Sequence, residues 1–176
     1  MIVILMGVAG SGKSTIAHAL VALTGWQFAE GDDYHTEANR QKMHAGIPLT
    51  DEDRLPWLNR LHDVLIGWQK SGLSGVLACS ALKQSYRDIL EKNLPPGSYR
   101  FVLLDAPVAV LAARMHNRPG HFMNPDLLQS QLDTLELPAD ALRIDATQTP
   151  EAVAREILRQ ITLPDTTRGV PEPRSR

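Results

Sequence analysis

The chain has 176 residues, of which 43% are hydrophobic and 22% are charged, and its formal net charge at pH 7 is −2. This length suits one domain with a full hydrophobic core, and the near-neutral charge gives no basic field that would attract nucleic acid or a membrane surface. The chain has one cysteine, Cys79, and no run that approaches the roughly 20 apolar residues of a membrane span. Its apolar start is only six residues long and has no basic leader. These features predict a soluble cytoplasmic protein.

Apolar runs and helical spacing predict strands that alternate with helices along the chain. Ile2–Met6 is apolar throughout and ends at a glycine, which is typical of a buried central strand. Thr50 followed by three acids is typical of a helix N-terminus with a capping box. The predicted strands are Ile2–Met6, Trp26–Ala29, Gly75–Cys79, Tyr99–Leu104 and Ala141–Ile144. The predicted helices are Lys13–Leu23, His35–Ala45, one from Thr50 to about Lys70, Leu82–Lys92, Val108–Asn117, Asn124–Leu135 and Pro150–Ile161.

This alternation predicts an α/β fold, namely a doubly wound five-stranded parallel sheet with helices on both faces and a mobile lid, as in nucleoside-monophosphate-kinase-like P-loop kinases. We expect one kinase domain over residues 1–161, with the lid at about 114–124. Residues 162–176 contain three prolines and few apolar side chains, which predicts a flexible tail. Ligands of such sheets bind at the carboxyl ends of the strands, so the chemistry is expected in the segments that follow each strand.

The segment from Gly7 to Ser14 matches the phosphate-binding pattern G-x-x-x-x-G-K-[ST] in full, between a predicted strand and a predicted helix. Its glycines let the backbone curl so that successive N–H groups point at phosphate oxygens, and the helix that begins there adds the positive end of its dipole. Lys13 is expected to hold the β- and γ-phosphates, and Ser14 to offer an oxygen to Mg²⁺. The sequence therefore predicts a site for ATP and Mg²⁺ made by Gly7, Val8, Ala9, Gly10, Ser11, Gly12, Lys13, Ser14 and Thr15.

Polar residues follow the second and third predicted strands. Asp32 comes after the second strand, where a carboxylate can accept the proton of an acceptor hydroxyl; a turn or N-cap acid is the alternative. Lys83 and Arg87 lie four residues apart after the third strand and are predicted to share one helix face. Two cations suit a carboxylate, which Arg87 can grip in bidentate fashion with Arg54 as a third contact. A solvated basic helix face is the alternative, and the arrangement favours an acidic acceptor.

From the phosphate loop onward, the order of motifs resembles that of the gluconate kinase (gluconokinase) family of P-loop kinases. The resemblance covers nearly the whole chain, from about Ile2 to Ile161, and many motifs in one order are more specific than a phosphate loop alone. The residues that carry it are Met6–Ser14; Gly31, Asp32 and His35; Asn39, Lys42 and Met43; Pro48–Arg54 with Pro56–Leu58; Cys79–Lys83 with Tyr86–Asp88; and Arg114, Arg118, Gly120–Phe122, Gln131 and Thr134–Glu136.

The resemblance implies transfer of the γ-phosphate of ATP to the 6-hydroxyl of D-gluconate, giving 6-phospho-D-gluconate. In related small kinases, the acid two residues before the substrate-side acid lies near the metal. Glu30 takes that place here, where the family more usually has Asp, so Glu30 and Ser14 are the candidate Mg²⁺ ligands. The resemblance also implies a homodimer, and no nucleic-acid or membrane partner is expected.

Four more residues are candidates by type and position. His35 and His121 can hydrogen-bond the hydroxyls of a polyol substrate. Thr147 and Gln148 follow the last predicted strand and are candidates for the edge of the adenine ring.

Arg114 and Arg118 are the remaining predicted catalytic residues. They lie four apart at the end of a helix that Pro119-Gly120 breaks, so we expect them to bring positive charge to the transferring phosphoryl group from the mobile lid. Charges that complement the helix dipole are the alternative interpretation.

Two other functions stay open. Another small-molecule kinase, shikimate- or nucleotide-kinase-like, would use the same scaffold with a different acceptor. A P-loop ATPase that switches partners would need a metal-binding acid at the end of an apolar strand, and Asp105 is the candidate. We favour instead a loop or helix-start aspartate before Pro107, and the sequence has no N-K-x-D motif of a GTPase.

Overall fold

The structure, a computed structural model, describes residues 1–117 and 125–162. A five-stranded sheet with the strand order β2-β3-β1-β4-β5 forms its centre, and all four strand pairs are parallel. The strands are β1 (Ile2–Met6), β2 (Gln27–Glu30), β3 (Gly75–Ala78), β4 (Tyr99–Asp105) and β5 (Leu142–Asp145). The helices are α1 (Lys13–Thr24), the short 3₁₀ helix η1 (Gly31–Tyr34), α2 (Glu37–His44), α3 (Asp51–Lys70), α4 (Gln84–Glu91), α5 (Val108–His116), α6 (Pro125–Thr134) and α7 (Pro150–Thr162).

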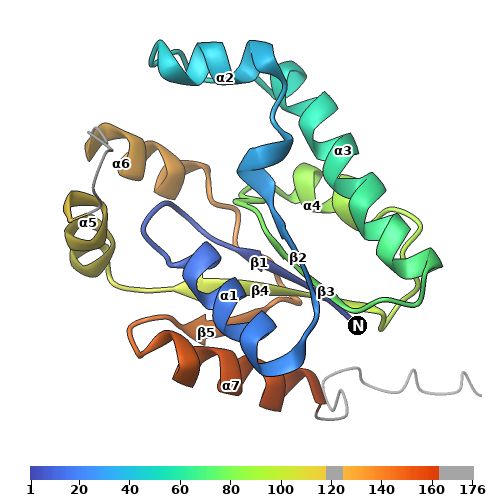
Figure 1. The fold of residues 1–176 in the computed structure, drawn as a ribbon. Helices are drawn as coiled ribbons and strands as arrows, with labels where there is room; N and C mark the ends of the chain where they lie inside the picture. The colour runs from blue at the N-terminus through green and yellow to red at the C-terminus, as the bar shows by residue number, and fades with distance from the viewer. Residues whose placement is uncertain (118–124, 163–176) are drawn as a thin grey trace, which may run out of the picture.

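Helices cover both faces of the sheet (Figure 1). Alternate residues of each strand point to opposite faces, so the central strand β1 contributes to two separate clusters of buried side chains. One cluster joins the sheet to α3 and α4, and the other joins it to α1 and α7. Every residue of β1 is buried, which explains its continuous apolar sequence.

A smaller third cluster lies at the carboxyl ends of the strands. Val8 of the loop between β1 and α1 packs there against Leu111 and Met115 of α5 and Leu128 of α6. Figure 1 shows α5 and α6 beside that loop. The two helices are thereby held against the segment that the sequence predicts to bind phosphate.

The predicted doubly wound five-stranded parallel sheet and the predicted order of strands and helices are confirmed, and the ends differ by one or two residues. Helix α2 begins two residues later than predicted, at Glu37, because the Thr36 side chain caps it, accepting a hydrogen bond from Asn39 N. The capping box predicted at Thr50 is present, with Asp53 as its second member. Within residues 1–117 and 125–162, we find no helix with the length and apolar character of a membrane span.

The prediction that Lys83 and Arg87 share a helix face is wrong. Helix α4 begins at Gln84, and Lys83 is its N-cap residue in an extended conformation. The segment before it is fixed by Ala81, which has a positive φ of 42° and is fully buried. Lys83 therefore extends from the end of this turn, while Arg87 lies within the helix.

Candidate active site

The loop from Gly7 to Ser14 joins the carboxyl end of β1 to the first turn of α1. Gly10 has a φ of 79°, and a Cβ there would lie 2.7 Å from the backbone oxygen of Leu111, so this position needs glycine. The Lys13 Nζ donates hydrogen bonds to the backbone oxygens of Gly7 and Val8, at 2.9 and 3.1 Å. The ammonium group thus lies over the loop, where it can meet phosphate oxygens.

One polar atom of the loop fits the same interpretation. Among the described residues, the Ser11 hydroxyl is the single buried side-chain N or O atom without a hydrogen-bond partner. A buried polar atom left without a partner costs free energy, and such atoms gather at functional sites. The curled backbone, the lysine and this hydroxyl together suit a triphosphate.

Glu30 and Asp32 lie next to this loop, at the end of β2. A Cβ on Gly31, between them, would lie 2.6 Å from the backbone oxygen of Ala78, so β2 and β3 end in close contact. Burial raises the pKa of the neighbouring Cys79 thiol to about 12; the charges of Asp32 and Glu30 act in the same direction, and Lys13 opposes them. Both acids and the loop lysine therefore act on Cys79 electrostatically, and the buried thiol is inert as a nucleophile.

His35 is held in a buried position beside Asp32. Its ring stacks on Trp57 with centroids 4.5 Å apart, and its Nδ1 lies 3.4 Å from Asn39 Nδ2. Trp57 also donates a hydrogen bond from Nε1 to the backbone oxygen of Gly31, at 2.7 Å. Burial lowers the pKa of His35, with Asp32 opposing and Arg54 and Arg40 adding to the effect. The ring is therefore neutral at pH 7. The hydrogen bond from Trp57, a residue of α3, to Gly31 fixes the segment that carries Asp32.

Lys83 and Arg54 lie around one aromatic ring. Lys83 Nζ is 5.5 Å and Arg54 Cζ 5.9 Å from the centroid of Tyr86. Lys83 also donates to both carboxylate oxygens of Asp51, at 2.8 and 2.7 Å, and the Tyr86 hydroxyl donates to Asp51 Oδ1. Hydrogen bonds from Lys83 and then Tyr86 lower the pKa of Asp51. Lys83 and Tyr86 therefore already bind a carboxylate, that of Asp51.

Arg87 is buried and turned toward the backbone. Its guanidinium donates to the backbone oxygens of Ala81 and Leu82, at 3.0 and 3.1 Å, and to the Gln84 side chain, at 2.8 and 3.2 Å. Burial lowers its pKa. In this structure Arg87 fastens the turn that precedes Lys83, so a direct contact with a substrate would need some of these bonds to open.

Arg114 lies between the phosphate loop and the loop after β5. It donates a hydrogen bond to the backbone oxygen of Ala146, at 2.7 Å, and its NH1 lies 4.0 Å from the position of a Cβ on Gly12. Next to it, hydrogen bonds from the Thr147 hydroxyl and backbone N–H lower the pKa of Asp145. The predicted phosphate-side arginine and the predicted adenine residue are therefore neighbours.

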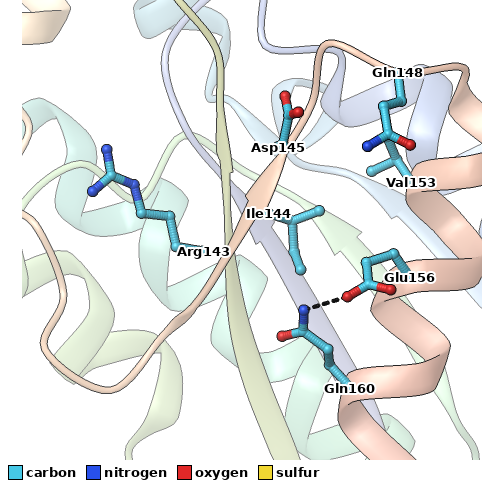
Figure 2. Close-up of a pocket in the computed structure, with 7 residues that line it drawn as sticks. All are labelled: Arg143, Ile144, Asp145, Gln148, Val153, Glu156 and Gln160. Carbon is cyan, nitrogen blue, oxygen red and sulfur yellow. Dashed lines mark hydrogen bonds between the residues drawn. The ribbon is translucent and has the colours of Figure 1, made fainter.

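A cavity of about 200 Å³ lies at the edge of the sheet, between β5 and α7. Gln148, the second predicted adenine residue, lines it together with Asp145 and Glu156 (Figure 2). No residue from 7 to 14 lines this cavity, so it is separate from the phosphate loop.

Asp105 is the last residue of β4, not a loop or helix-start residue as favoured from the sequence. Its carboxylate forms an ion pair with Arg143, with Arg143 NH2 at 2.7 Å from Oδ2. An acid already paired with arginine gives little support to the ATPase interpretation, in which Asp105 would hold the metal.

Two predicted site residues, Arg118 and His121, lie outside the described residues, as does most of the predicted lid. Residues 163–176 of the predicted tail also lie outside them. The sequence interpretation missed three residues that the structure brings to the site: Asp51, Trp57 and Gln131. Each belongs to a motif of the family resemblance, but only the three-dimensional contacts assign a role to it.

Comparison with known proteins places this architecture among P-loop kinases. The AAA domain family matches residues 2–138. The chain is 45% identical over 165 residues to a gluconokinase of Gluconobacter oxydans, with 92% of each protein covered. It is 48% identical over 146 residues to the thermosensitive gluconokinase of Escherichia coli, with 81% of this chain and 77% of that protein covered.

Solved structures give the same result. A gluconokinase from Sinorhizobium meliloti has a TM-score of 0.80 to this chain at 44% sequence identity, and 90% of each chain is covered. A shikimate kinase from Acinetobacter baumannii has a TM-score of 0.56 at 19% identity, with 91% of this chain and 92% of that chain covered, and is similar in fold alone.

Proposed function

Because this chain belongs to the gluconokinase family of P-loop kinases, we propose that it transfers the γ-phosphoryl group of ATP to the 6-hydroxyl of D-gluconate. The products are ADP and 6-phospho-D-gluconate. The observation that carries the proposal is that the phosphate loop with Lys13 and the segment of Glu30 and Asp32 lie on either side of the end of β3, where Gly7 N donates to Ser80 O at 3.3 Å and Glu30 pairs with Ala78. A phosphate clamp and an acid beside it are two of the groups that phosphoryl transfer to an alcohol uses.

Asp32 acts as the base in this proposal. Its carboxylate accepts the proton of the 6-hydroxyl while that oxygen attacks the γ-phosphorus in line, and the bond from the phosphorus to the β,γ-bridging oxygen breaks. Lys13 holds the β- and γ-phosphates, and Arg114 adds positive charge from α5. Trp57 keeps Asp32 in place through the backbone of Gly31.

The carboxylate of the acceptor is bound by the cations at the start of α3 and α4. Lys83 and Arg54 lie around Tyr86, and Lys83 and the Tyr86 hydroxyl already bind one carboxylate, that of Asp51. Gluconate replaces Asp51 there, while the neutral His35 hydrogen-bonds a hydroxyl of the sugar chain. Arg87 supports this site through the turn that carries Lys83.

Ser14 and Glu30 are the residues that we propose to hold Mg²⁺, which would neutralise negative charge on the phosphates of the nucleotide. Among the described residues, no three His, Cys, Asp or Glu side chains gather into a metal cluster. A small number of protein ligands is usual for Mg²⁺, because it keeps several waters and binds phosphate oxygens. Thr147 and Gln148 are proposed to contact the adenine. The cytoplasmic location, the homodimer and the lid with Arg118 and His121 stay predictions from the sequence.

A coupled assay of ADP release over a panel of acceptors tests the proposal. The panel contains D-gluconate, neutral sugars, shikimate and nucleoside monophosphates. We expect kcat/KM to be highest for gluconate, and ADP release to need both an acceptor and Mg²⁺. Activity on a nucleotide or on shikimate but not on gluconate would overturn the acceptor, and ATP turnover independent of any acceptor would favour an ATPase.

A further inference from the structure

The Gln131 side chain of α6 reaches into the phosphate loop. Its Oε1 accepts a hydrogen bond from the backbone N–H of Ala9, at 2.6 Å. Ala9 is the third residue of the loop, whose backbone N–H groups are the donors that cradle phosphate. A side-chain oxygen therefore stands where an oxygen of the terminal phosphate would be received.

The position of Gln131 is fixed by its helix. Leu128, Leu132 and Leu135 lie at helical spacing around it and pack with Val8 and Ala9 in the cluster that joins α6 to the phosphate loop. Gln131 is a polar residue on this apolar face, and it is half-buried. A leucine would pack equally well at this position, so packing does not explain why the side chain is an amide.

The two ends of the amide offer different chemistry to a phosphate. Within the part of the chain that the structure describes, the Gln131 Nε2 makes no hydrogen bond. A terminal phosphate bound to the Ala9 N–H would repel Oε1, whose lone pairs face it, and would attract Nε2, which carries two N–H donors. A half-turn of the amide about its last torsion exchanges the two groups without moving α6, because this torsion is broad and soft.

We propose that Gln131 is a positioning residue that responds to the terminal phosphate of the nucleotide. In the absence of nucleotide, its Oε1 accepts the hydrogen bond of the Ala9 N–H. In the ATP complex, a γ-phosphate oxygen accepts from the Ala9 N–H instead, and the Gln131 Nε2 donates to the same phosphoryl group. Gln131 thereby discriminates ATP from ADP and orders the loop before transfer. This inference rests on the proposed use of ATP, although not on gluconate as the acceptor.

The test compares the affinity of three variants for ADP and for a non-hydrolysable ATP analogue, both with Mg²⁺, by calorimetry. Gln131→Glu keeps the shape and the acceptor for Ala9 but has no donor and carries a negative charge. We expect it to weaken binding of the analogue by about tenfold or more while ADP changes little, because two like charges would lie a few ångströms apart. Gln131→Met lacks both groups and is expected to weaken the analogue by a smaller factor.

Gln129→Glu is the matched control, because Gln129 is exposed on the same helix and bonds only to Asp133, at 2.8 Å, within the described residues. It should leave the ratio of the two dissociation constants unchanged. A purely structural Gln131 would lower both affinities by one factor, so an unchanged ratio in both Gln131 variants, or undiminished binding of the analogue by Gln131→Glu, would overturn the inference. Failure of the unmodified protein to bind either nucleotide would instead refute the ATP site itself.

Discussion

Lys83 donates to both carboxylate oxygens of Asp51, with Nζ at 2.8 Å from Oδ1 and 2.7 Å from Oδ2. The two residues are 32 positions apart in sequence, and they join the N-terminus of α3 to the N-cap of α4. A residue of the chain thus binds the cation that we propose for the carboxylate of gluconate. Substrate binding therefore competes with an internal ion pair, and this competition can be measured.

Replacing Asp51 with Asn should lower KM for gluconate by about two- to fivefold, because gluconate would no longer displace a charged partner from an exposed pair. The KM for ATP should not change. Steady-state kinetics at constant ionic strength give both values. Asp63→Asn, an exposed acid on the same helix, is the control, and a rise in the gluconate KM of Asp51→Asn would mean that Asp51 positions Lys83 and does not compete with substrate.

Asp32→Asn should reduce kcat by about 10²–10⁴, the usual contribution of a positioned general base, while affinity for ATP is kept. The neighbouring Asp33 is the matched control. Its side chain is exposed, and its described contact is through the backbone oxygen, which accepts from Arg40 NH2 at 2.6 Å. Asp33→Asn should therefore retain activity. Similar kcat values for the two variants would show that Asp32 is not the base.

Arg87→Met should lower Tm by roughly 5–10 °C, since the backbone oxygens of Ala81 and Leu82 would lose their charged donor inside the protein. The released turn carries Lys83, so KM for gluconate should rise much more than KM for ATP. Thermal unfolding and steady-state kinetics measure the two effects. Equal rises in both KM values would contradict a role in the acceptor site.

The pH dependence of stability should reveal the buried His35. Its pKa is lowered by burial, so the unfolded chain binds more protons than the folded one as pH falls below the unfolded value of 6.5. The contribution to stability is therefore complete above pH 6.5 and is lost as pH falls toward the folded pKa. Asp32 opposes this shift, and Arg54 and Arg40 strengthen it.

The measurement is the free energy of unfolding in urea from pH 5 to 7.5, for the unmodified protein and for His35→Gln. The difference between them should be constant above pH 6.5 and should shrink below it, since the variant has no imidazole to protonate. A difference that is independent of pH over this range would mean that His35 titrates normally in the folded protein.

The sequence predicts the fold well because its features are local. The continuous apolar sequence of Ile2–Met6 is enough to predict a buried strand, and the capping box at Thr50 is complete within four positions. The phosphate loop is equally local, since eight consecutive residues define it. Such features need no knowledge of distant parts of the chain.

The acceptor side of the site is harder to predict because it depends on pairs that are distant in sequence. Spacing alone put Lys83 and Arg87 on one helix face, but Ala81 turns the chain and α4 begins later. The contact between Gln131 and Ala9 spans 122 positions. Neither periodicity nor a sequence motif predicts which residues make such contacts, because the contacts form only when the sheet brings the ends of its strands together.

The most direct test of the central claim is the identity of the product, measured by ³¹P NMR after incubation with ATP, Mg²⁺ and D-gluconate. We predict one new phosphate ester per ADP formed, with its phosphorus coupled to the protons on carbon 6 of gluconate. An ester on another oxygen, or ADP and inorganic phosphate with no sugar ester, would contradict the account.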